Sequence, residues 1–429
     1  MTDLWPIACI DECKRLDFRC GVGDAYATSL AGAFFSTFCK SLSPFSLIMT
    51  IASRERLNAR ELPMKGQDRM LAAGWTPWWT WAWPALAWGI LVIAAFFGGG
   101  AVLNAAAAAV LIATVFAAVY HAEVVAHRIG EPFGTLVLAV AVTVIEVALI
   151  VSVMVAGGEG KAGLARDTVF AAVMIVCNGI VGLCLLLGGV RHRVQDFHVE
   201  GASAALAVLA ALTILTLVVP NFATSAPGPA FSASQLVFAG AASLVLYASF
   251  VFVQTVRHRD YFLPVAGGGE EAHALPPSDR TALVSTGLLF ASLVAVVGLA
   301  KALTPALEMG LDWLKVPKAV IGIVIAALVL LPEGLAALRA ARGNRLQTSL
   351  NLALGSALAS IGLTIPAVAA VSLALGKPLE LGLGAKEEVL LVLTLFVGVI
   401  TLGTGRTTVL QGIVHLVIFA SFLFLAVVP

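Results

Sequence analysis

Two glutamates, Glu146 and Glu333, lie near the middle of apolar stretches, Gly130–Val155 and Val316–Leu338. An apolar helix of about 20 residues spans a bilayer. A central acidic residue costs about 2.5 to 3.5 kcal/mol on insertion, while each central Leu, Ile, Val or Phe returns about 0.3 to 0.6 kcal/mol. Both helices therefore insert, but each carboxyl group must face the protein interior, where it is either protonated or bound to a cation.

The pair of glutamates predicts a site at which protons and a cation compete. Two carboxylates on crossing helices would neutralise a divalent ion, and burial favours their protonated forms. Pro332 precedes Glu333 and frees a backbone carbonyl oxygen, which is a ligand suited to a hard cation. Competition for one shared site amounts to antiport. For either glutamate alone, the alternative is a protonated carboxyl that hydrogen-bonds between helices.

Polar side chains near the glutamates are secondary candidates for the same cation- and proton-binding site. Thr143 precedes Glu146 by three residues, so both lie on one helix face. Further candidates on the following helices are Asn178 in MIVCNGIVGL and Asn351, Ser356 and Ser360 in NLALGSALASIGLTIP. Each could supply an oxygen ligand, although hydrogen bonding between membrane helices explains a lone Asn or Ser at least as well.

The composition places these residues in an all-α polytopic membrane protein. Of 429 residues, 60% are hydrophobic and only 12% charged, whereas soluble chains are about 25% charged. After a cluster of tryptophans typical of a membrane interface, eleven apolar runs each predict a transmembrane helix. Their approximate spans are 82–99, 101–120, 133–156, 168–190, 203–220, 233–256, 281–302, 317–340, 349–374, 387–404 and 408–428.

The order of these runs predicts two inverted repeats. The polar connection 258–280 separates a preliminary helix, 82–99, and five helices within 101–257 from five more within 281–429. Because five is odd, homologous halves insert in opposite orientations. The two glutamate segments align, and each is followed by a helix that contains Gly-Leu, at Gly182-Leu183 and Gly362-Leu363. We therefore expect about 11 transmembrane helices, ten of them forming a core of two inverted five-helix repeats.

Loop charges predict the orientation. With a cytoplasmic N-terminus and an outside C-terminus, the outer loops carry seven basic residues: Lys161, Arg166, Lys301, Lys315, Lys318, Lys377 and Lys386. The cytoplasmic loops then carry ten: Arg128, Arg191, Arg193, Arg257, Arg259, Arg280, Arg339, Arg342, Arg345 and Arg406. This bias follows the positive-inside rule.

Residues 1–75 form an N-terminal extension of different character. Asp11, Glu12 and Asp17 occupy the positions where a signal peptide has its basic region and apolar core. The preferred interpretation is a start codon assigned too far upstream. A soluble appendage or an extra membrane-associated segment is the alternative.

Several function classes lack a sequence signal. A net charge of +1 and the absence of a basic face give no indication of nucleic-acid binding. The sequence has no His-Glu-x-x-His helix and no Gly-x-Ser-x-Gly turn, so it does not predict an enzyme. A channel is disfavoured because no repeated filter motif is evident. The expected partners are transported cations, protons and the lipid bilayer, with no cofactor, and the oligomeric state is not defined.

Three segments resemble the bacterial calcium/proton antiporters of the ChaA type, within the cation/calcium exchanger superfamily. They are HRIGEPFGTLVLAVAVTVIEVALIVSVM, ARDTVFAAVMIVCNGIVGLCLLLGG and VLLPEGLAALRAARGNRLQTSLNLALGSALASIGLTIPA. The resemblance implies a bacterial inner-membrane protein that exports Ca²⁺, or in some members Na⁺ or K⁺, in exchange for H⁺ by alternating access. It also implies that Glu146 and Glu333 are paired metal ligands and that Asn178 and Ser356 occupy polar positions on the adjoining helices.

The chain departs from the wider superfamily at these positions. Vacuolar-type relatives have Gly-Asn-Ala-Thr/Ala-Glu where this chain has Val142-Thr143-Val144-Ile145-Glu146 and Leu330-Leu331-Pro332-Glu333. It also has Ala359 where those relatives have Gln. Fewer side-chain oxygens are thus available, so a monovalent Na⁺(K⁺)/H⁺ antiporter with little calcium activity is the alternative function.

Overall fold

A computed structural model describes residues 77–98, 100–130, 133–155, 162–263, 277–314, 317, 319–377 and 379–428. The chain divides into two units, Met1–Met64 and Lys65–Pro429, and all of these residues belong to the second. The predicted N-terminal extension 1–75 and most of the 258–280 connection lie outside the described residues. The boundaries assigned to the extension, the connection and the two repeats therefore stay predictions.

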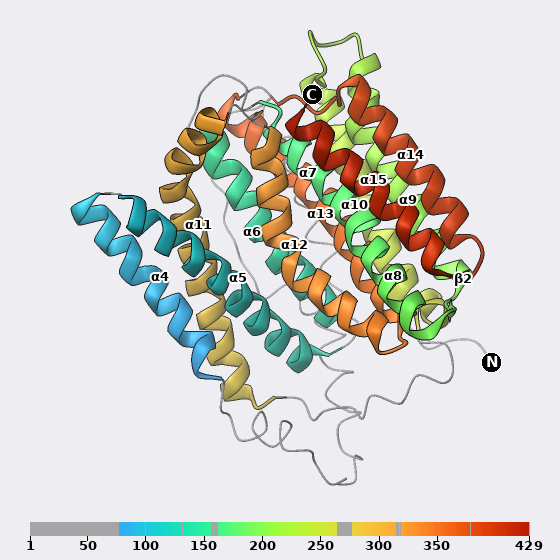
Figure 1. The fold of residues 1–429 in the computed structure, drawn as a ribbon. Helices are drawn as coiled ribbons and strands as arrows, with labels where there is room; N and C mark the ends of the chain where they lie inside the picture. The colour runs from blue at the N-terminus through green and yellow to red at the C-terminus, as the bar shows by residue number, and fades with distance from the viewer. Residues whose placement is uncertain are drawn as a thin grey trace, which may run out of the picture. The chain divides into compact units, whose positions relative to one another are not determined.

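The described residues form eleven continuous helical rods (Figure 1). The first six are α4 (Trp78–Phe97), α5 (Ala101–Ile129), α6 (Phe133–Val155), α7–η2–α8 (Leu164–Met174, Ile175–Ile180, Val181–His192), α9–η3–η4 (Val199–Thr213, Ile214–Val218, Val219–Phe222) and α10–η5 (Ala233–Phe252, Val253–Arg257). After η6 (Arg259–Phe262) come α11 (Asp279–Leu314), α12 (Ala319–Arg342), α13 (Leu346–Leu375), α14 (Ala385–Leu402) and α15 (Val409–Val427). The prediction of an all-α fold with eleven helices is confirmed.

Two helices are longer than predicted. α5 continues to Ile129 rather than ending at residue 120, and α11 continues to Leu314 rather than 302. An apolar run ends at the first cluster of polar residues, such as His121 and Glu123. The backbone hydrogen bonds of a helix continue through such residues. Three rods also contain π-helical turns, η2, η3 and η5, and apolar patterning gives no signal for these.

Nine of the rods in the described part of the chain are long and apolar enough to cross a membrane. The other two are α6, whose stretch Ala139–Val151 is shorter, and α14, which begins with Lys386, Glu387 and Glu388. A segment crosses a bilayer only when its backbone N–H and C=O groups are hydrogen-bonded internally, as they are in a helix. The fold is that of a polytopic membrane protein.

The helices pack as two related sets of five, with α4 added to one face. α4 lies against α5 and α11, and these two first helices of the repeats also pack on each other (Figure 1). The second helices, α6 and α12, lie between this group and the rest of the bundle (Figure 1). The last helix of each repeat packs on the third helix of the other repeat: α10 on α13, and α15 on α8. This core positions α6, α12 and both third helices at its centre.

The contacts between loops agree with a topology in which every rod crosses the membrane once. β1 (Gln195–Asp196) pairs antiparallel with β2 (Arg406–Thr407), and six rods separate the two strands in sequence. An even number of crossings returns a chain to the same side, as this pairing requires. We call this end, which carries the ten arginines predicted to be cytoplasmic, the arginine end. The side chains of Arg128 and Asp279 and of Arg406 and Asp196 form ion pairs there.

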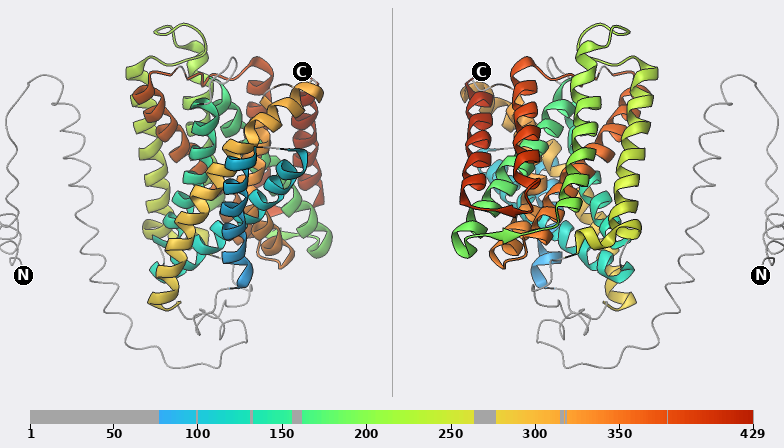
Figure 2. Two further views of the ribbon diagram at one scale, coloured as in Figure 1. Left: turned by 90° about the vertical axis from the view of Figure 1, so that its left-hand side faces the viewer. Right: turned by 90° about the vertical axis from the view of Figure 1, so that its right-hand side faces the viewer.

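The opposite end of the bundle is also joined by loop contacts. The Glu380 backbone N–H donates to the Ala162 carbonyl, and the Leu383 N–H donates to the Leu217 carbonyl. α14 and α15, drawn in red, lie side by side between the two ends (Figure 2). The two ends therefore correspond to the two predicted faces of the membrane, although which of them is cytoplasmic stays a prediction from charge.

Glycines let α15 approach α8 closely. A Cβ atom at Gly412 would lie 2.5 Å from the Leu186 backbone nitrogen, and one at Gly182 would lie 3.1 Å from the His415 Cβ. Small residues at helix contacts permit such approach in membranes, where van der Waals packing drives helix association.

Replacing Gly412 with alanine should destabilise the protein, because the new methyl group would push backbone against backbone. We expect a loss of about 1 to 3 kcal/mol, the usual cost of overpacking, measured as a lower melting temperature in detergent. Gly89→Ala on α4 is the matched control, since a Cβ there meets nothing within 4 Å. Equal melting temperatures for Gly412→Ala and the parent would contradict the tight contact.

Candidate cation site

Glu146 is held at the centre of the bundle by two hydroxyl groups. Its side chain is 1% exposed, and its Oε2 accepts hydrogen bonds from Ser360 Oγ at 2.5 Å and Thr364 Oγ1 at 3.1 Å. Both donors are on α13, four residues apart and therefore one above the other on the face that packs against α6. The remaining oxygen, Oε1, is buried without a hydrogen-bond partner in the described structure.

Glu333 occupies the matching place on α12, directly after Pro332. Its Oε2 is likewise buried without a hydrogen-bond partner in the described structure. Buried carboxyl oxygens are normally satisfied, because each unsatisfied polar group costs about 1 to 3 kcal/mol or more. A proton or a metal ion satisfies such an oxygen. Each glutamate thus presents one oxygen atom fit for either ligand.

Both glutamates line one cavity of about 120 Å³. Its walls come from α6, α10, η5, α12 and α13. The predicted site residues that it brings together with the two acids are Thr143, Asn351, Ser356 and Ser360. Six of the seven predicted side chains therefore meet in one place, and the cavity supplies carboxylate, hydroxyl and amide oxygens, the ligand types that hard cations prefer.

The cavity extends from the glutamates toward the arginine end. Ser360, deep on α13, is 5% exposed, whereas Ser356 and Asn351, nearer the start of that helix, are progressively closer to the arginine end and partly exposed. Gln254, in the last turns of the α10–η5 rod, is also partly exposed at this side. In this conformation the approach to the glutamates is from the arginine end.

The charged side chains close to Glu146 and Glu333 are acidic. No described residue that lines the cavity is a Lys, Arg or His, so no side-chain cation there neutralises the two glutamates. Glu123 of α5 also repels the Glu333 carboxylate, while Arg339 attracts Glu123. Such a field favours bound cations or protons over free carboxylates.

Asn178 is the predicted site residue that does not line this cavity. It lies in η2 and is fully buried, and its side chain is turned toward α14 and α15. Its Nδ2 donates to Thr394 Oγ1 at 2.8 Å, and its Oδ1 is 3.0 Å from His415 Nδ1. Its role as a cation ligand stays a prediction from the resemblance.

Three residues at the cavity escaped the sequence analysis. Thr364 binds Glu146 directly, and Tyr247 and Gln254 line the walls. Thr364 follows the predicted Ser360 by four residues, so helical spacing alone could have placed it on the same face. Tyr247 and Gln254 belong to α10 and η5, whose packing on α13 cannot be read from hydropathy.

The two halves of the site are unequal. When Gly182-Leu183 is aligned with Gly362-Leu363, the positions of Ser360 and Ile180 correspond, as do those of Thr364 and Cys184. Ile180 lies close to α12 beside Glu333, since a Cβ on Gly334 would be 3.1 Å from its Cδ1. Hydroxyl donors therefore face Glu146, and an apolar side chain lies beside Glu333.

In the described part of the chain, no three His, Cys, Asp or Glu side chains gather in metal-binding geometry. The arrangement suits a cation that enters and leaves, held by two carboxylates and weak neutral ligands, better than one held permanently.

Comparisons with known proteins point to one family. Residues 99–256 and 284–428 match the family described as sodium/calcium exchanger protein. The chain is 56% identical over 323 residues to the protein y4hA of Sinorhizobium fredii (strain NBRC 101917 / NGR234). The matched region covers 74% of this chain and 87% of that protein. It is 37% identical over 316 residues to the sodium-potassium/proton antiporter ChaA of Escherichia coli (strain K12), covering 73% and 85% of the two chains.

Solved structures share the fold. The structure of native YfkE is similar with a TM-score of 0.64 at 19% identity, over 82% of this chain and all (100%) of that chain. The H⁺/Ca²⁺ exchanger CAX is similar with a TM-score of 0.62 at 13% identity, over 84% and 89%. At these identities the likeness concerns the fold alone.

Cation binding should raise the melting temperature of the parent protein but not of Glu146→Gln or Glu333→Gln. A ligand that binds only the folded state stabilises it, by about 2.7 kcal/mol at 100 times its dissociation constant. Thermal shift in detergent measures this with CaCl₂, NaCl or KCl, and choline chloride controls for ionic strength. Glu200→Gln, at an exposed acid on α9, should keep the parent response; a parent-like response in Glu146→Gln would remove that residue from the site.

Proposed function

The chain belongs to the sodium/calcium exchanger family, and from this premise we propose that it is a proton-coupled cation antiporter that works by alternating access at Glu146 and Glu333. The family is described as one of sodium/calcium exchangers, so cation exchange is its general activity. The single observation that carries the proposal is that two acids, from matching helices of two repeats, face one cavity. Bacterial relatives support a place in the inner membrane.

The chemistry follows from charge balance in a low dielectric. Two buried carboxylates without a basic neighbour among the described residues carry a charge of about −2, which is costly in the bundle interior. Two protons, or one divalent cation, bring the pair to neutrality, and so does one monovalent cation together with one proton. Each form excludes the others at the same oxygens, so binding of a cation displaces protons. This reciprocal displacement is the coupling step.

Alternating access then exchanges the ions. In the conformation described here, the cavity leads from the glutamates to the arginine end, which the loop charges assign to the cytoplasm. A cation from that side displaces protons from Glu146 and Glu333. After the bundle repacks to open the other end, external protons displace the cation, and the proton gradient drives export.

Two cation classes are compatible with this scheme. Ca²⁺ suits the paired carboxylates, and the fold neighbours include proteins named as Ca²⁺/H⁺ exchangers. Na⁺ or K⁺ is the second candidate, because Ile180 replaces a hydroxyl donor beside Glu333 and the 37% identical relative is named a sodium-potassium/proton antiporter. We propose Ca²⁺ export with accompanying Na⁺ or K⁺ activity, and a purely monovalent exchanger as the alternative.

Everted membrane vesicles test antiport directly. After respiration acidifies the lumen, a cation added outside should release protons in exchange, so the quenched fluorescence of a pH-sensitive dye recovers. Glu146→Gln and Glu333→Gln should each reduce the recovery at least about 100-fold, because an amide cannot balance a cation or carry the coupled proton. Glu200→Gln is the control. Full recovery in either site variant would remove the paired-glutamate mechanism.

The same vesicles distinguish the two cation classes. We expect Ca²⁺ to collapse the gradient at lower concentration than Na⁺ or K⁺, since a divalent ion gains more from two carboxylates. Recovery with Na⁺ and K⁺ but not with Ca²⁺ would select the monovalent alternative. A failure of all three cations in well-expressed protein would count against the proposed function as a whole.

A further inference from the structure

A buried chain of hydrogen bonds joins the third helix of the first repeat to the last two helices of the second. Its members are Asn178 in η2, Thr394 and Thr401 on α14, and His415 on α15, each between 0% and 3% exposed. His415 bridges two of them, with Nδ1 3.0 Å from Asn178 Oδ1 and Nε2 3.1 Å from Thr401 Oγ1. None of the four lines the glutamate cavity.

The donors and acceptors in this chain of hydrogen bonds can be assigned in one consistent direction. Thr394 donates its hydroxyl proton to the Leu390 carbonyl at 2.7 Å, so its oxygen accepts from Asn178 Nδ2. Asn178 Oδ1 can only accept, which assigns the ring proton of His415 to Nδ1. Nε2 then accepts from the Thr401 hydroxyl. Every buried donor is used, and buried polar networks satisfied in this way fix one arrangement of their helices.

Repeat symmetry shows what this position does in the other half. The Cβ of His415 faces Gly182, as the Cβ of Tyr247 faces Gly362: a methyl on either glycine would lie 3.1 Å and 2.6 Å away, respectively. His415 on α15 is therefore the counterpart of Tyr247 on α10. Tyr247 lines the open glutamate cavity, whereas His415 is bonded across the equivalent helix contact.

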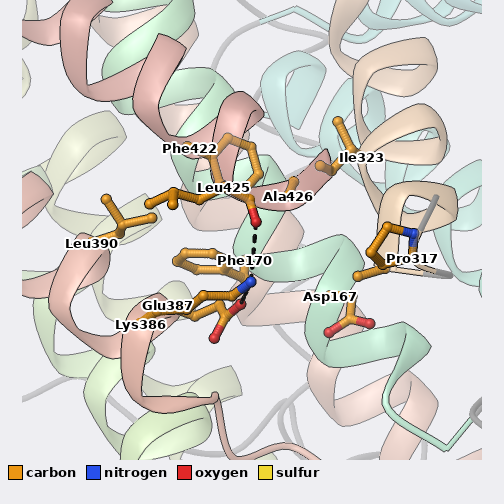
Figure 3. A pocket seen from close by; sticks show the side chains of 11 residues that line it. Asp167, Phe170, Pro317, Ile323, Lys386, Glu387, Leu390, Phe422, Leu425 and Ala426 are labelled. Carbon is orange, nitrogen blue, oxygen red and sulfur yellow. Dashed lines mark hydrogen bonds and ion pairs between the residues drawn. The ribbon is translucent and has the colours of Figure 1, made fainter. Parts of the chain in front are cut away.

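A second, smaller cavity of about 80 Å³ lies on this side, and Figure 3 shows the side chains that line it. Its lining residues Asp167, Ala319 and Lys386 are near the starts of α7, α12 and α14, which places it at the end opposite the arginines. Helices α7, α12, α14 and α15 supply its walls. Three of them, α7, α12 and α15, are the repeat-related counterparts of α13, α6 and α10 at the first cavity. Lys386 Nζ donates to the Leu425 carbonyl at its rim at 3.0 Å (Figure 3). Beneath it, the rings of Phe170 and Phe422 meet edge to face with centroids 5.5 Å apart.

We propose that Asn178 and His415 form a clasp that keeps the second cavity closed from the glutamates while the first cavity is open. The clasp ties η2 to α14 and α15 below the Phe170–Phe422 contact, so separating these helices requires breaking it. His415 is thus a conformational positioning residue that does not touch the transported ion. The inference rests on the proposed function only in reading the two cavities as alternate entrances.

Cysteine labelling of the full chain tests the clasp without any transport assay. Leu352→Cys reports on the first cavity and Ile323→Cys on the second, since both residues are partly buried cavity-lining positions. Cys9, Cys13, Cys20 and Cys39 are replaced with serine, while the buried Cys177 and Cys184 remain. Reaction of the purified protein with a polar maleimide is followed by mass spectrometry.

His415→Leu, which removes the hydrogen bonds to Asn178 and Thr401, should shift the two rates in opposite directions. Labelling at residue 323 should rise and labelling at 352 fall, each about tenfold, because one state loses two buried hydrogen bonds. Asn178→Leu should act alike, and the double variant should add little. His415→Gln, which keeps an amide donor, should stay close to the parent, as should His258→Leu at an exposed position.

The outcomes separate the clasp from lost packing and from the proposed function. Rates that rise at both cysteines indicate general loosening and overturn the clasp, as do unchanged rates in His415→Leu and Asn178→Leu. Thr401→Val, a milder change at the far side of the ring, should shift both rates in the same reciprocal sense if His415→Leu fails to fold. A reciprocal shift in a protein that exchanges no cation would keep the clasp and reject the antiport.

Discussion

The structure depends on the difficulty of keeping two carboxyl groups in the membrane interior when no described basic side chain lies beside them. Two like charges about 4 Å apart repel by roughly 4 kcal/mol even at an effective dielectric constant of 20. Glu146 and Glu333 share a cavity that no described Lys, Arg or His side chain lines. In the proposed antiport, ions that come from outside the protein balance this charge, and the cavity must connect to water for those ions to arrive.

The arrangement of the helices follows from that requirement. A site near the middle of the bundle needs walls from helices that can separate at one end and stay packed at the other. The third helices provide this, since α13 carries polar residues toward the arginine end and mostly buried apolar residues beyond Thr364. Glycines at 182 and 412 keep α15 and α8 in close contact on the other side.

Much of this could be predicted from the sequence, because charge in an apolar helix is a strong signal. Glu146 and Glu333 stood out for that reason, and Thr143, Asn351, Ser356 and Ser360 followed from their helical positions. The pairing of Ser360 and Thr364 with one carboxyl oxygen depends on how α6 crosses α13, and no single-helix pattern contains that angle. The orientation of Asn178 was also hidden, since it lies in a π-helical turn that changes the direction of side chains relative to a 3.6-residue period.

The differences between the halves are as informative as their similarity. Two identical inverted repeats would make the two openings equal in free energy, because exchanging the halves would convert one state into the other. Ser360 and Thr364 beside Glu146, against Ile180 and Cys184 in the other half, break that equality, as does Tyr247 against His415. A bias of a few kcal/mol is enough to populate one opening almost alone. We therefore expect the polar contacts that distinguish the two halves to set which of the two openings is populated.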